Sequence, residues 1–341
     1  MRQAVAIALG LLVALPAIAR DKISAEGLYA GSNIGLGPIS TRSYAMGKMF
    51  FPGPDVHFPL ARGTSTWRVD TTIGWANIFN LRRETDRNYI IDGEWLLMSF
   101  GVSREVHDRW RLGMVIPIVT RFGGSLDSEI ESFHDALGIG NSKRDQSPLN
   151  RVRVEYDDEQ GRPRNIDDKD STGLSDIRVF ATYLATHGAI ASQAVELFVT
   201  AGIPTGDSAN LEGAGMFNLG AGARLSRRLL NRHWYSYATL LGVYAFGDDF
   251  RGIKINQEHF SINAAIEYRV SSTASALLQV LSSTAWARDF GEFSKGSTEL
   301  AIGGKWIMGN GSILELALIE NLFQHQNSPD IGLHVTWTSH F

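Results

Sequence analysis

The last twelve residues of the chain restrict its fold more than any other segment. From Asp330 onward they read D-I-G-L-H-V-T-W-T-S-H-F, so large apolar residues alternate with small or polar ones. Successive side chains of a β-strand point to opposite faces, and the pattern therefore predicts a strand with one apolar and one polar face. An edge strand of a soluble sheet could show the same alternation, so the rest of the chain has to decide between the two.

Both ends of the chain favour a membrane β-barrel. A final aromatic residue, Phe341, after an amphipathic strand resembles the sorting signal of bacterial outer-membrane barrels. At the other end, Arg2 precedes an apolar run that is shorter than the roughly 20 residues of a membrane-spanning helix. Ala17 and Ala19 then form a small-x-small cleavage site. Residues 1–19 are therefore predicted to be a signal peptide, with a retained anchor as the alternative.

Twelve segments with alternating polarity follow one another along the chain. Each is long enough for the roughly 9–11 residues that a tilted strand needs to cross a membrane. The predicted strands are residues 65–79, 89–102, 109–122, 174–186, 194–204, 217–226, 234–246, 260–270, 273–286, 298–307, 313–321 and 331–341. Aromatic residues cluster near their ends, as in the two girdles of membrane barrels.

The connections between these segments alternate in length. The odd-numbered connections are longer or more polar, and the longest covers residues 123–173. The even-numbered ones are short, such as 271–272 and 308–312. In outer-membrane barrels the outward loops are long and the periplasmic turns are short. The sequence therefore predicts that residues 123–173 form an extracellular loop.

Several short motifs are similar to those of a proteobacterial family of outer-membrane barrels, filed as domain of unknown function 3187. The motifs are Phe133–Gly138, Arg144–Asp145, Pro148–Arg151 and Gly173–Arg178. The resemblance would span most of the chain, from about Asn33 to Phe341. It implies the fold and the location in the outer membrane, and it implies no activity.

The polar face of the predicted strands is unusually rich in charge. It carries five positive residues, namely Arg68, Arg178, Arg224, Arg269 and Lys305. It carries eight negative residues, namely Asp70, Asp92, Glu94, Asp176, Glu196, Glu267, Glu299 and Glu315. These lumen-lining candidates indicate either a network of ion pairs in the wall or a polar passage with mild cation preference. Glu196 and Glu299 have no adjacent basic residue in the sequence, and replacing both by Gln is expected to weaken that preference.

Two segments outside the strands need a separate interpretation. Residues 24–63 contain many glycines and prolines and alternate little, so they cannot face lipid. They either fill the lumen as a plug or lie in the periplasm. In the loop of residues 123–173, Ser128 and Glu131 form a capping box, and Ile130, Phe133 and Leu137 follow at helical spacing. A short helix is expected there.

The sequence contains little that indicates enzymatic chemistry. His259 and Ser261 loosely resemble the His-x-Ser of outer-membrane lipid hydrolases, with Asn263 and Glu267 nearby. Both residues fall on the predicted inward face, away from a membrane lipid. No cofactor, metal site or catalytic residue is predicted, and 36 acidic against 32 basic residues give no reason to expect nucleic acid binding.

Together these features predict an all-β protein, a transmembrane antiparallel up-and-down β-barrel of about 12 strands. Residues 1–19 would be the signal peptide, 20–63 an irregular N-terminal segment and 64–341 the barrel. The expected function is a channel or transporter for a small or hydrophobic solute that the sequence does not identify. The alternatives are a plugged structural or surface-interaction barrel and a lipid hydrolase. Expected partners are outer-membrane lipids, lipopolysaccharide, the export machinery and the barrel-assembly machinery.

The C-terminal strand provides a first test. If Phe341 is part of a sorting signal, its deletion should lower the amount of folded protein in the outer membrane. The measurement is the abundance of the truncated protein and its heat-modifiable mobility in gels. Normal abundance and normal mobility would contradict a sorting role for the terminal residue.

Overall fold

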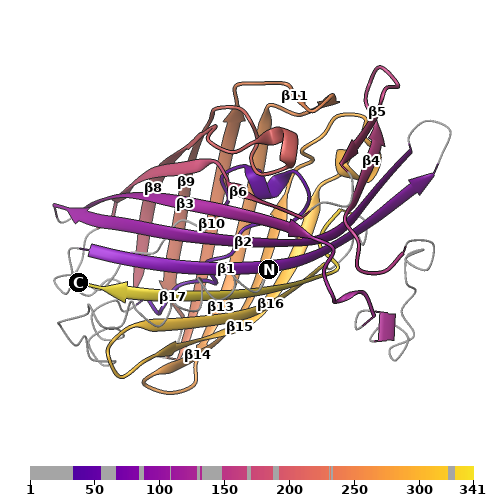
Figure 1. Ribbon diagram of the computed structural model, residues 1–341. Coiled ribbons are helices and arrows are strands. Elements are labelled where there is room, and N and C mark those ends of the chain that lie inside the picture. Colours follow the sequence, from indigo (N-terminus) through magenta and orange to yellow (C-terminus); the bar gives the residue numbers. More distant parts are fainter. Residues whose placement is uncertain are drawn as a thin grey trace.

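The computed structural model describes residues 34–54, 67–83, 88–107, 109–128, 131–132, 148–166, 170–186, 192–229, 231, 233–321 and 327–341. Within these residues, twelve antiparallel strands form a closed barrel, because β1 (Trp67–Arg83) pairs with β17 (Ile331–His340) as well as with β2 (Asn88–Val106) (Figure 1). The prediction of an all-β, twelve-stranded antiparallel barrel is confirmed.

The remaining barrel strands follow in chain order, and each pairs with its neighbours in the sequence. They are β3 (Trp110–Phe122), β6 (Ser171–Leu174) with β7 (Ile177–Leu184), β8 (Gln193–Ile203), β9 (Asn218–Arg228), β10 (Trp234–Ala245), β13 (Glu258–Arg269), β14 (Ala274–Ser283), β15 (Ser297–Ile307) and β16 (Ile313–Asn321). The fourth barrel strand is interrupted. β7 pairs with the first half of β3, and β6 pairs with its second half.

Alternating exposure distinguishes the two faces of the wall. In β8, Leu197 and Val199 are 49% and 51% exposed, whereas Glu196 and Phe198, which have the other parity, are 2% and 3% exposed. Apolar side chains thus point outward, where lipid replaces water, and polar side chains point into the lumen. This arrangement leaves the outer face apolar in most strands, as a barrel in a bilayer requires.

Aromatic pairs mark the two ends of this apolar outer face. We call the end with the short connections the turn end and the opposite end the loop end. Rings of Trp234 and Tyr268 lie 4.8 Å apart at the turn end, and rings of Phe217 and Phe246 lie 5.4 Å apart at the loop end. Amphipathic rings prefer the headgroup level of a bilayer, so the pairs indicate where the hydrocarbon layer begins and ends.

The loop end carries further ordered elements. A hairpin of β4 (Arg153–Asp157) and β5 (Pro163–Ile166) extends the sheet beside β2. β11 (Asp249–Phe250) pairs with β12 (Ile253–Lys254). In the described part of the chain, the short 3₁₀ helices are η2 (Lys48–Phe50), η4 (Ser208–Asn210) and η5 (Gly291–Ser294).

The helix predicted in the loop of residues 123–173 is described only in part. Residues 127–128 and 131–132 are helical, and the Ser132 hydroxyl donates to the Ser128 carbonyl at 2.8 Å. Ile130, Phe133 and Leu137, on which the prediction rested, lie outside the described residues. Among the residues that the structure describes, no helix is long and apolar enough to cross a membrane.

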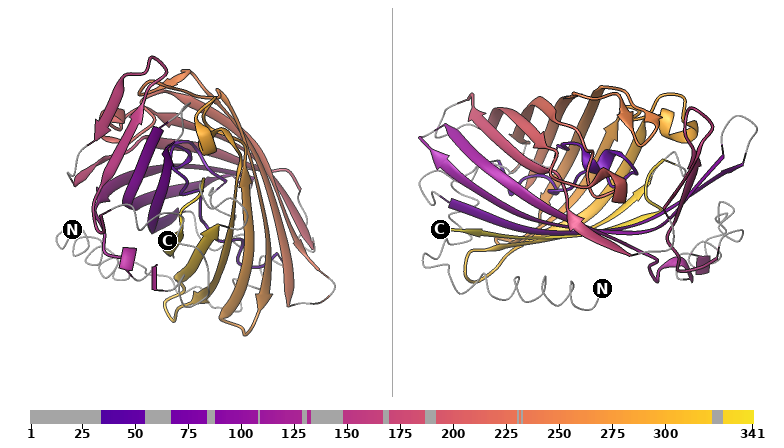
Figure 2. Two further views of the ribbon diagram at one scale, coloured as in Figure 1. Left: turned by 90° about the vertical axis from the view of Figure 1, so that its right-hand side faces the viewer. Right: turned by 45° about the horizontal axis from the view of Figure 1, so that its top comes forward.

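Residues 34–54, which we call the internal segment, run inside the barrel. Figure 2 shows the indigo segment enclosed by the ring of strands. Ile39 and Met49 are each 1% exposed, although the segment contains no strand. Of the two alternatives for residues 24–63, a plug therefore fits the described part. Residues 1–33 lie outside the described part of the chain, so the cleaved signal peptide stays a prediction.

The outer face provides a second test. Leu316 lies midway along β16 and is 40% exposed toward the lipid side. Leu316→Arg should destabilise the folded barrel by about 2–4 kcal/mol, because a charge near the bilayer midplane loses its hydration. The measurement is urea unfolding in lipid vesicles. Leu149→Arg is the matched control, since Leu149 is 44% exposed in a connection at the loop end. Equal destabilisation by both substitutions would contradict the assignment of the outer face.

Candidate functional site

The lumen is the candidate site, and most predicted lumen-lining residues lie in it. Ten of the thirteen are buried on the inner face: Arg68, Asp70, Asp176, Arg178, Glu196, Arg224, Glu267, Glu299, Lys305 and Glu315. Arg269 is half-buried at the turn end, where its Nε donates to the Ser271 carbonyl at 3.4 Å. Whether these residues line a route for a solute stays a prediction.

The prediction that Asp92 and Glu94 face the lumen is wrong. Glu94 pairs in register with Asn77, and Asp92 pairs with Phe79. Residues in register share one face of a sheet. Asn77 and Phe79 have the same parity as the outward-facing Trp75, whose indole N–H donates to the Glu94 carboxylate at 2.6 Å. The carboxylates of Asp92 and Glu94 therefore lie on the outer face of the wall and not in the lumen.

A loop beyond β3 explains why charged residues are tolerated on that face. The backbone N–H groups of Ser125 and Leu126 each donate to Glu94 at 2.8 Å. Asp127 accepts a hydrogen bond from Asn77 at 3.1 Å and one from the backbone N–H of Asn150 at 2.7 Å. The chain after β3 thus folds back over the outer wall, where its backbone donates to Glu94 and its Asp127 accepts from Asn77.

Charged residues missed by the sequence interpretation also face the lumen. Arg111 and Arg121 are buried on β3, and His334 and His340 are buried on β17. The sequence of β3 could have predicted this, because Arg111 and Arg121 occupy odd positions, whereas the outward-facing Trp110 occupies an even one. With two carboxylates outside and two arginines inside, the basis for a mild cation preference disappears.

Within the wall, the inner charges form close pairs. Glu196 and Arg224 lie 3.1 Å apart and are almost fully buried. Arg68 pairs with Asp70 at 2.8 Å, and Arg111 pairs with Glu105 at 2.7 Å. Burial strengthens such pairs, and it makes the loss of one partner costly because an uncompensated charge remains. This part of the lumen matches the predicted ion-pair network.

Hydrogen bonds attach the start of the internal segment to strands on one side of the barrel. The Glu267 carboxylate on β13 accepts from the backbone N–H of Leu36 at 2.9 Å and from the hydroxyls of Tyr237 and Ser275 at 2.5 Å each. The Tyr237 hydroxyl lies in turn 2.7 Å from the Ile34 carbonyl. Glu267 is therefore a structural anchor for the segment as well as part of the wall.

The middle of the segment is held by a second carboxylate. Glu315 on β16 accepts from the backbone N–H of Ser40 at 2.8 Å. The same carboxylate lies 2.7 Å from the Lys305 ammonium and 2.8 Å from the His334 imidazole. The other His334 ring nitrogen contacts the Tyr44 hydroxyl at 3.1 Å. The segment thus completes a network that begins in the wall.

A third attachment lies closer to the loop end. Glu299 on β15 accepts from the Ser43 hydroxyl at 2.5 Å and from the backbone N–H of Tyr44 at 3.4 Å. The Lys48 ammonium donates to the Ser297 hydroxyl at 2.8 Å. Burial lowers the pKa of Lys48 to about 8, and the nearby Glu299 opposes that shift. The three carboxylates Glu267, Glu315 and Glu299 therefore follow the segment from the turn end toward the loop end.

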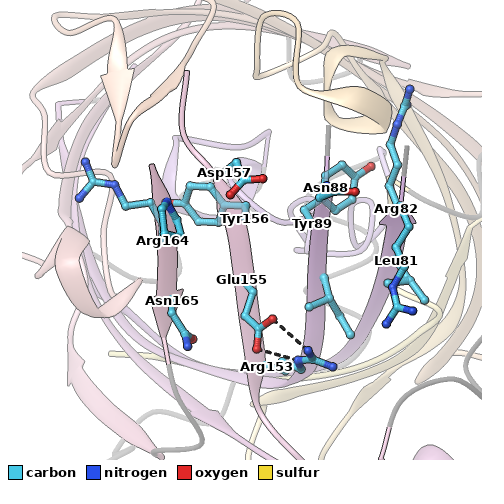
Figure 3. Close-up of a pocket in the computed structure, with 13 residues that line it drawn as sticks. Leu81, Arg82, Asn88, Tyr89, Arg153, Glu155, Tyr156, Asp157, Arg164 and Asn165 are labelled. Carbon is cyan, nitrogen blue, oxygen red and sulfur yellow. Dashed lines mark hydrogen bonds and ion pairs between the residues drawn. The ribbon is translucent and has the colours of Figure 1, made fainter. Parts of the chain in front are cut away.

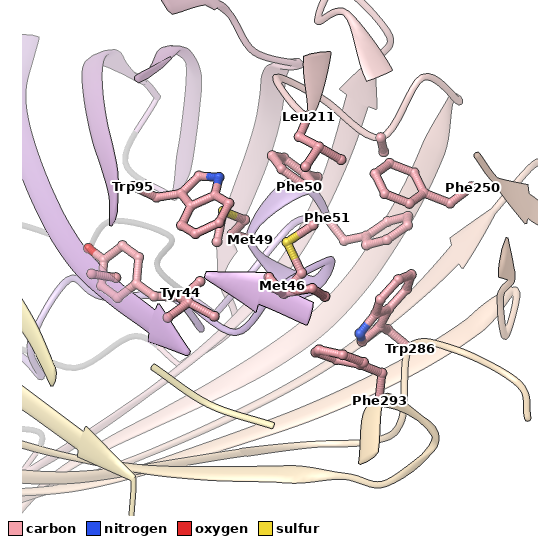
Figure 4. Packing of buried hydrophobic residues seen from close by; sticks show 14 of the residues in the cluster. Tyr44, Met46, Met49, Phe50, Phe51, Trp95, Leu211, Phe250, Trp286 and Phe293 are labelled. Atoms are coloured by element: carbon pink, nitrogen blue, oxygen red, sulfur yellow. The ribbon is translucent and has the colours of Figure 1, made fainter. Parts of the chain in front are cut away.

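At the loop end the segment enters an apolar core (Figure 4). The rings of Phe50 and Phe250 lie 5.9 Å apart, and Phe250 meets Trp286 at 5.9 Å. Met46, Met49 and Phe51 from the segment join this cluster, as do Trp95 and Val119 from the wall. Connections at the loop end contribute Leu211, Phe290 and Phe293. These contacts fill the loop end with apolar side chains.

A small cavity remains between the segment and the opposite wall. Its volume is about 30 Å³, close to the space of one water molecule. Polar groups line much of it, among them Ser40 and Arg42 from the segment and Asp70, Thr72 and Arg178 from β1 and β7. The internal segment and the inner wall of β1–β3 and β7 therefore meet at a polar boundary.

The residues of the hydrolase hypothesis do not form a catalytic arrangement. His259 faces inward and its ring lies 4.5 Å from that of Phe51. Glu267 is eight residues further along the strand, roughly 27 Å away at the usual rise per residue, so it cannot orient His259. Glu267 is also engaged by the internal segment. Within the described residues, no group of three or more His, Cys, Asp or Glu residues could hold a metal ion.

The sequence matches a known protein family over most of its length. The model of the family described as "Protein of unknown function (DUF3187)" matches residues 23–341. The chain belongs to this family. No curated protein matches it.

Comparison with solved structures concerns the fold. The COG4313 outer membrane channel from Pseudomonas putida F1 is similar with a TM-score of 0.54 at 12% identity, over 85% of this chain and 99% of that one. The NanC porin follows with a TM-score of 0.45 at 10% identity, over 80% and 98% of the two chains. The toluene transporter TbuX from Ralstonia pickettii has a TM-score of 0.39 at 9% identity, over 81% and 90%. The first similarity confirms that this DUF3187 protein has an outer-membrane β-barrel fold.

The pair of Glu196 and Arg224 provides a third test. Glu196→Gln should destabilise the barrel by about 3–5 kcal/mol, because it leaves the buried Arg224 without its closest counter-charge. The double variant Glu196→Gln/Arg224→Gln should lose less than the sum of the two single variants. The measurement is urea unfolding of all three variants in lipid vesicles. Additive losses would show that the pair does not act as a unit.

Proposed function

We propose that this outer-membrane β-barrel is a channel for a small or hydrophobic solute and that the internal segment constricts its lumen. The supporting observation is that the two sides of the segment meet the wall differently. Glu267 on β13, Glu299 on β15 and Glu315 on β16 each accept hydrogen bonds from the segment. Toward β1–β3 and β7, a small polar cavity borders the segment at Ser40 and Arg42, and Phe50 and Phe51 pack with the wall at the loop end. Displacement of the segment would widen this cavity into a passage.

The chemistry along such a passage changes from end to end. A solute that enters at the loop end first meets the apolar core around Phe50, Phe250 and Trp286. It then meets paired charges on the inner wall, such as Glu196 and Arg224. Apolar and aromatic side chains with a few polar groups are typical of binding sites for small organic molecules. This order supports an apolar or amphipathic solute more than a free ion.

The apolar core also supports a second candidate, a barrel that is permanently plugged. Phe50 and Phe51 are 3% and 4% exposed, and the core joins the internal segment to β1–β3 and to several connections. A barrel closed by this core would be sufficient for a structural or surface-interaction protein. The two candidates differ in one property, the passage of solutes through the purified protein.

Conductance in planar bilayers tests the proposal. The wild-type protein should show discrete channel openings. Phe50→Ala/Phe51→Ala should raise the open probability, because the substitutions remove much of the apolar contact that holds the segment at the loop end. Phe260→Ala is the matched control, since Phe260 lies on the outer face and is 57% exposed. Silent bilayers with both the wild type and the double variant would favour the plugged barrel.

A further inference from the structure

The wall continues beyond the loop end as a four-stranded sheet of β1, β2, β4 and β5, which we call the extension. Pairing of β2 with β3 ends at Glu94, and pairing of β1 with β17 ends at Asn77. Above this level β2 pairs with β4 over residues 89–92, and β4 pairs with β5. As a sheet, the extension therefore joins the barrel wall through β1 and β2.

A glycine lies where the extension leaves the wall. Gly93 stands between Glu94, which pairs with β3, and Asp92, which pairs with β4. Its φ is 148°, a backbone conformation that residues with a Cβ rarely adopt. A Cβ at this position would lie no closer than 3.4 Å to any atom beyond its two neighbours in the chain, so the backbone and not a lack of space requires glycine. Gly93 is therefore suited to be a hinge.

The extension crosses the mouth of the barrel. The strand order β2-β3-β7-β8-β9-β10-β13 places β13 six positions from β2, on the opposite side of the ring of strands. The connection before β13 contains the turn between β11 and β12, whose carbonyl groups accept hydrogen bonds from the extension. The Tyr156 hydroxyl donates to the Arg251 carbonyl at 3.0 Å, and the backbone N–H of Glu159 donates to the Gly252 carbonyl at 3.2 Å.

Aromatic side chains hold the inner face of the extension against the opposite rim. Tyr89 on β2 and Tyr156 on β4 pair in register (Figure 3). Their rings lie 5.3 Å and 5.7 Å from the ring of Phe290, which is 2% exposed in the connection between β14 and β15. The backbone N–H of Glu292 donates to the Tyr89 hydroxyl at 3.3 Å, and the Glu292 carboxylate lies 3.8 Å from the Arg82 guanidinium. These contacts form a latch.

The outer face of the extension has space beside it. Leu81, Ile90 and Glu155 share this face, because they pair in register and Ile90 has the same parity as Glu94. They line a cavity of about 430 Å³ (Figure 3). The inner face is thus packed on the rim, whereas the outer face borders free volume into which the extension can move.

The latch and the internal segment contact the same short hairpin. Phe250 on β11 packs on Phe50 of the segment at 5.9 Å, and its neighbour Arg251 accepts the hydrogen bond from the extension. Tyr89, Tyr156 and these phenylalanines belong to one apolar core. The extension therefore covers the core that fills the loop end.

We propose that the extension is a lid, which opens at Gly93 and admits a solute to the apolar core. Its role in admission rests on the proposed channel function and on the predicted extracellular position of the loop end, whereas its opening does not. Opening breaks the contacts of Tyr89 and Tyr156 with the opposite rim and leaves the wall strands paired. Local opening of this kind needs less free energy than global unfolding.

A reversible bridge across the latch tests the proposal, and the absence of cysteine from the chain makes introduced thiols unique. Arg82→Cys/Glu292→Cys places one thiol on the lid and one on the rim, at positions whose side chains already meet. Bridging by a short bis-methanethiosulfonate reagent should lower the open probability in planar bilayers by about tenfold or more, because the open state is lost from the equilibrium. A reducing agent should restore it.

Hydrogen exchange measures opening without conductance, because the Glu159 amide is bonded across the boundary of the lid. The bridge should slow exchange in the peptide that contains Glu159 by about tenfold or more. Gly93→Ala should accelerate it, because the closed conformation is then strained at the hinge. Mass spectrometry in lipid vesicles gives the rates, and heat-modifiable mobility verifies that each variant is folded.

Arg153→Cys/Glu155→Cys is the matched control, since this ion pair of 2.7 Å lies within β4 on the lid itself. Its bridge should change neither measurement. Unchanged exchange after bridging of Arg82→Cys/Glu292→Cys would overturn the lid. Slowed exchange with an unchanged open probability would overturn its role in admission. Silent bilayers before bridging, together with slowed exchange after it, would refute the channel function and support the lid.

Discussion

The structure depends on the closure of β1 against β17. In lipid no water is available to satisfy backbone N–H and C=O groups, so an open sheet edge would be very costly. The ten register pairs from Arg68–His340 to Asn77–Ile331 remove that edge. Closure also separates the two environments of the chain. Residues with one parity face lipid, residues with the other parity face a lumen, and every later feature of the protein follows from this separation.

The lumen must then be filled or hydrated, and here residues 34–54 fill much of it. The segment has no strand of its own, so its backbone groups need partners from the wall. Glu267, Glu315 and Glu299 supply them, each by accepting at least one backbone N–H from the segment. These three acidic residues of the inner wall are therefore occupied in holding the segment. They cannot be counted as free carboxylates of a cation route.

The outer face beyond the membrane is a third environment. The loop after Phe122 turns back over β1 and β2, where the backbone of Ser125 donates to Glu94 and Asp127 accepts from the Asn77 amide. Above this loop, the same face continues onto the β1–β2–β4–β5 extension, where polar residues line a cavity. One continuous strand, β2, thus passes from the lipid-facing wall to a polar surface without a change of parity. The outer side chains of β2 contact lipid along the wall and polar groups beyond it.

Much of this could be predicted from alternation and connection length. These signals are local, because the strand period of two residues is written directly in the sequence. They were sufficient for the twelve strands, their antiparallel order and ten of the buried inner-face charges, such as Glu196 and Arg224. The interruption between β6 and β7 was not predicted, since the strand expected at residues 174–186 contained Ser175 and Asp176 without a visible break.

The sequence alone determined the barrel, because lipid and backbone chemistry leave one solution for twelve amphipathic strands. Tertiary structure decided where individual charges went. Asp92 and Glu94 lie on the outer face, and Glu94 is satisfied there by backbone donors of a loop more than twenty-five residues away along the chain. Likewise, the choice between plug and periplasmic leader for residues 34–54 depended on distant carboxylates on β13, β15 and β16. Such pairings join residues far apart in sequence, and no local pattern contains them.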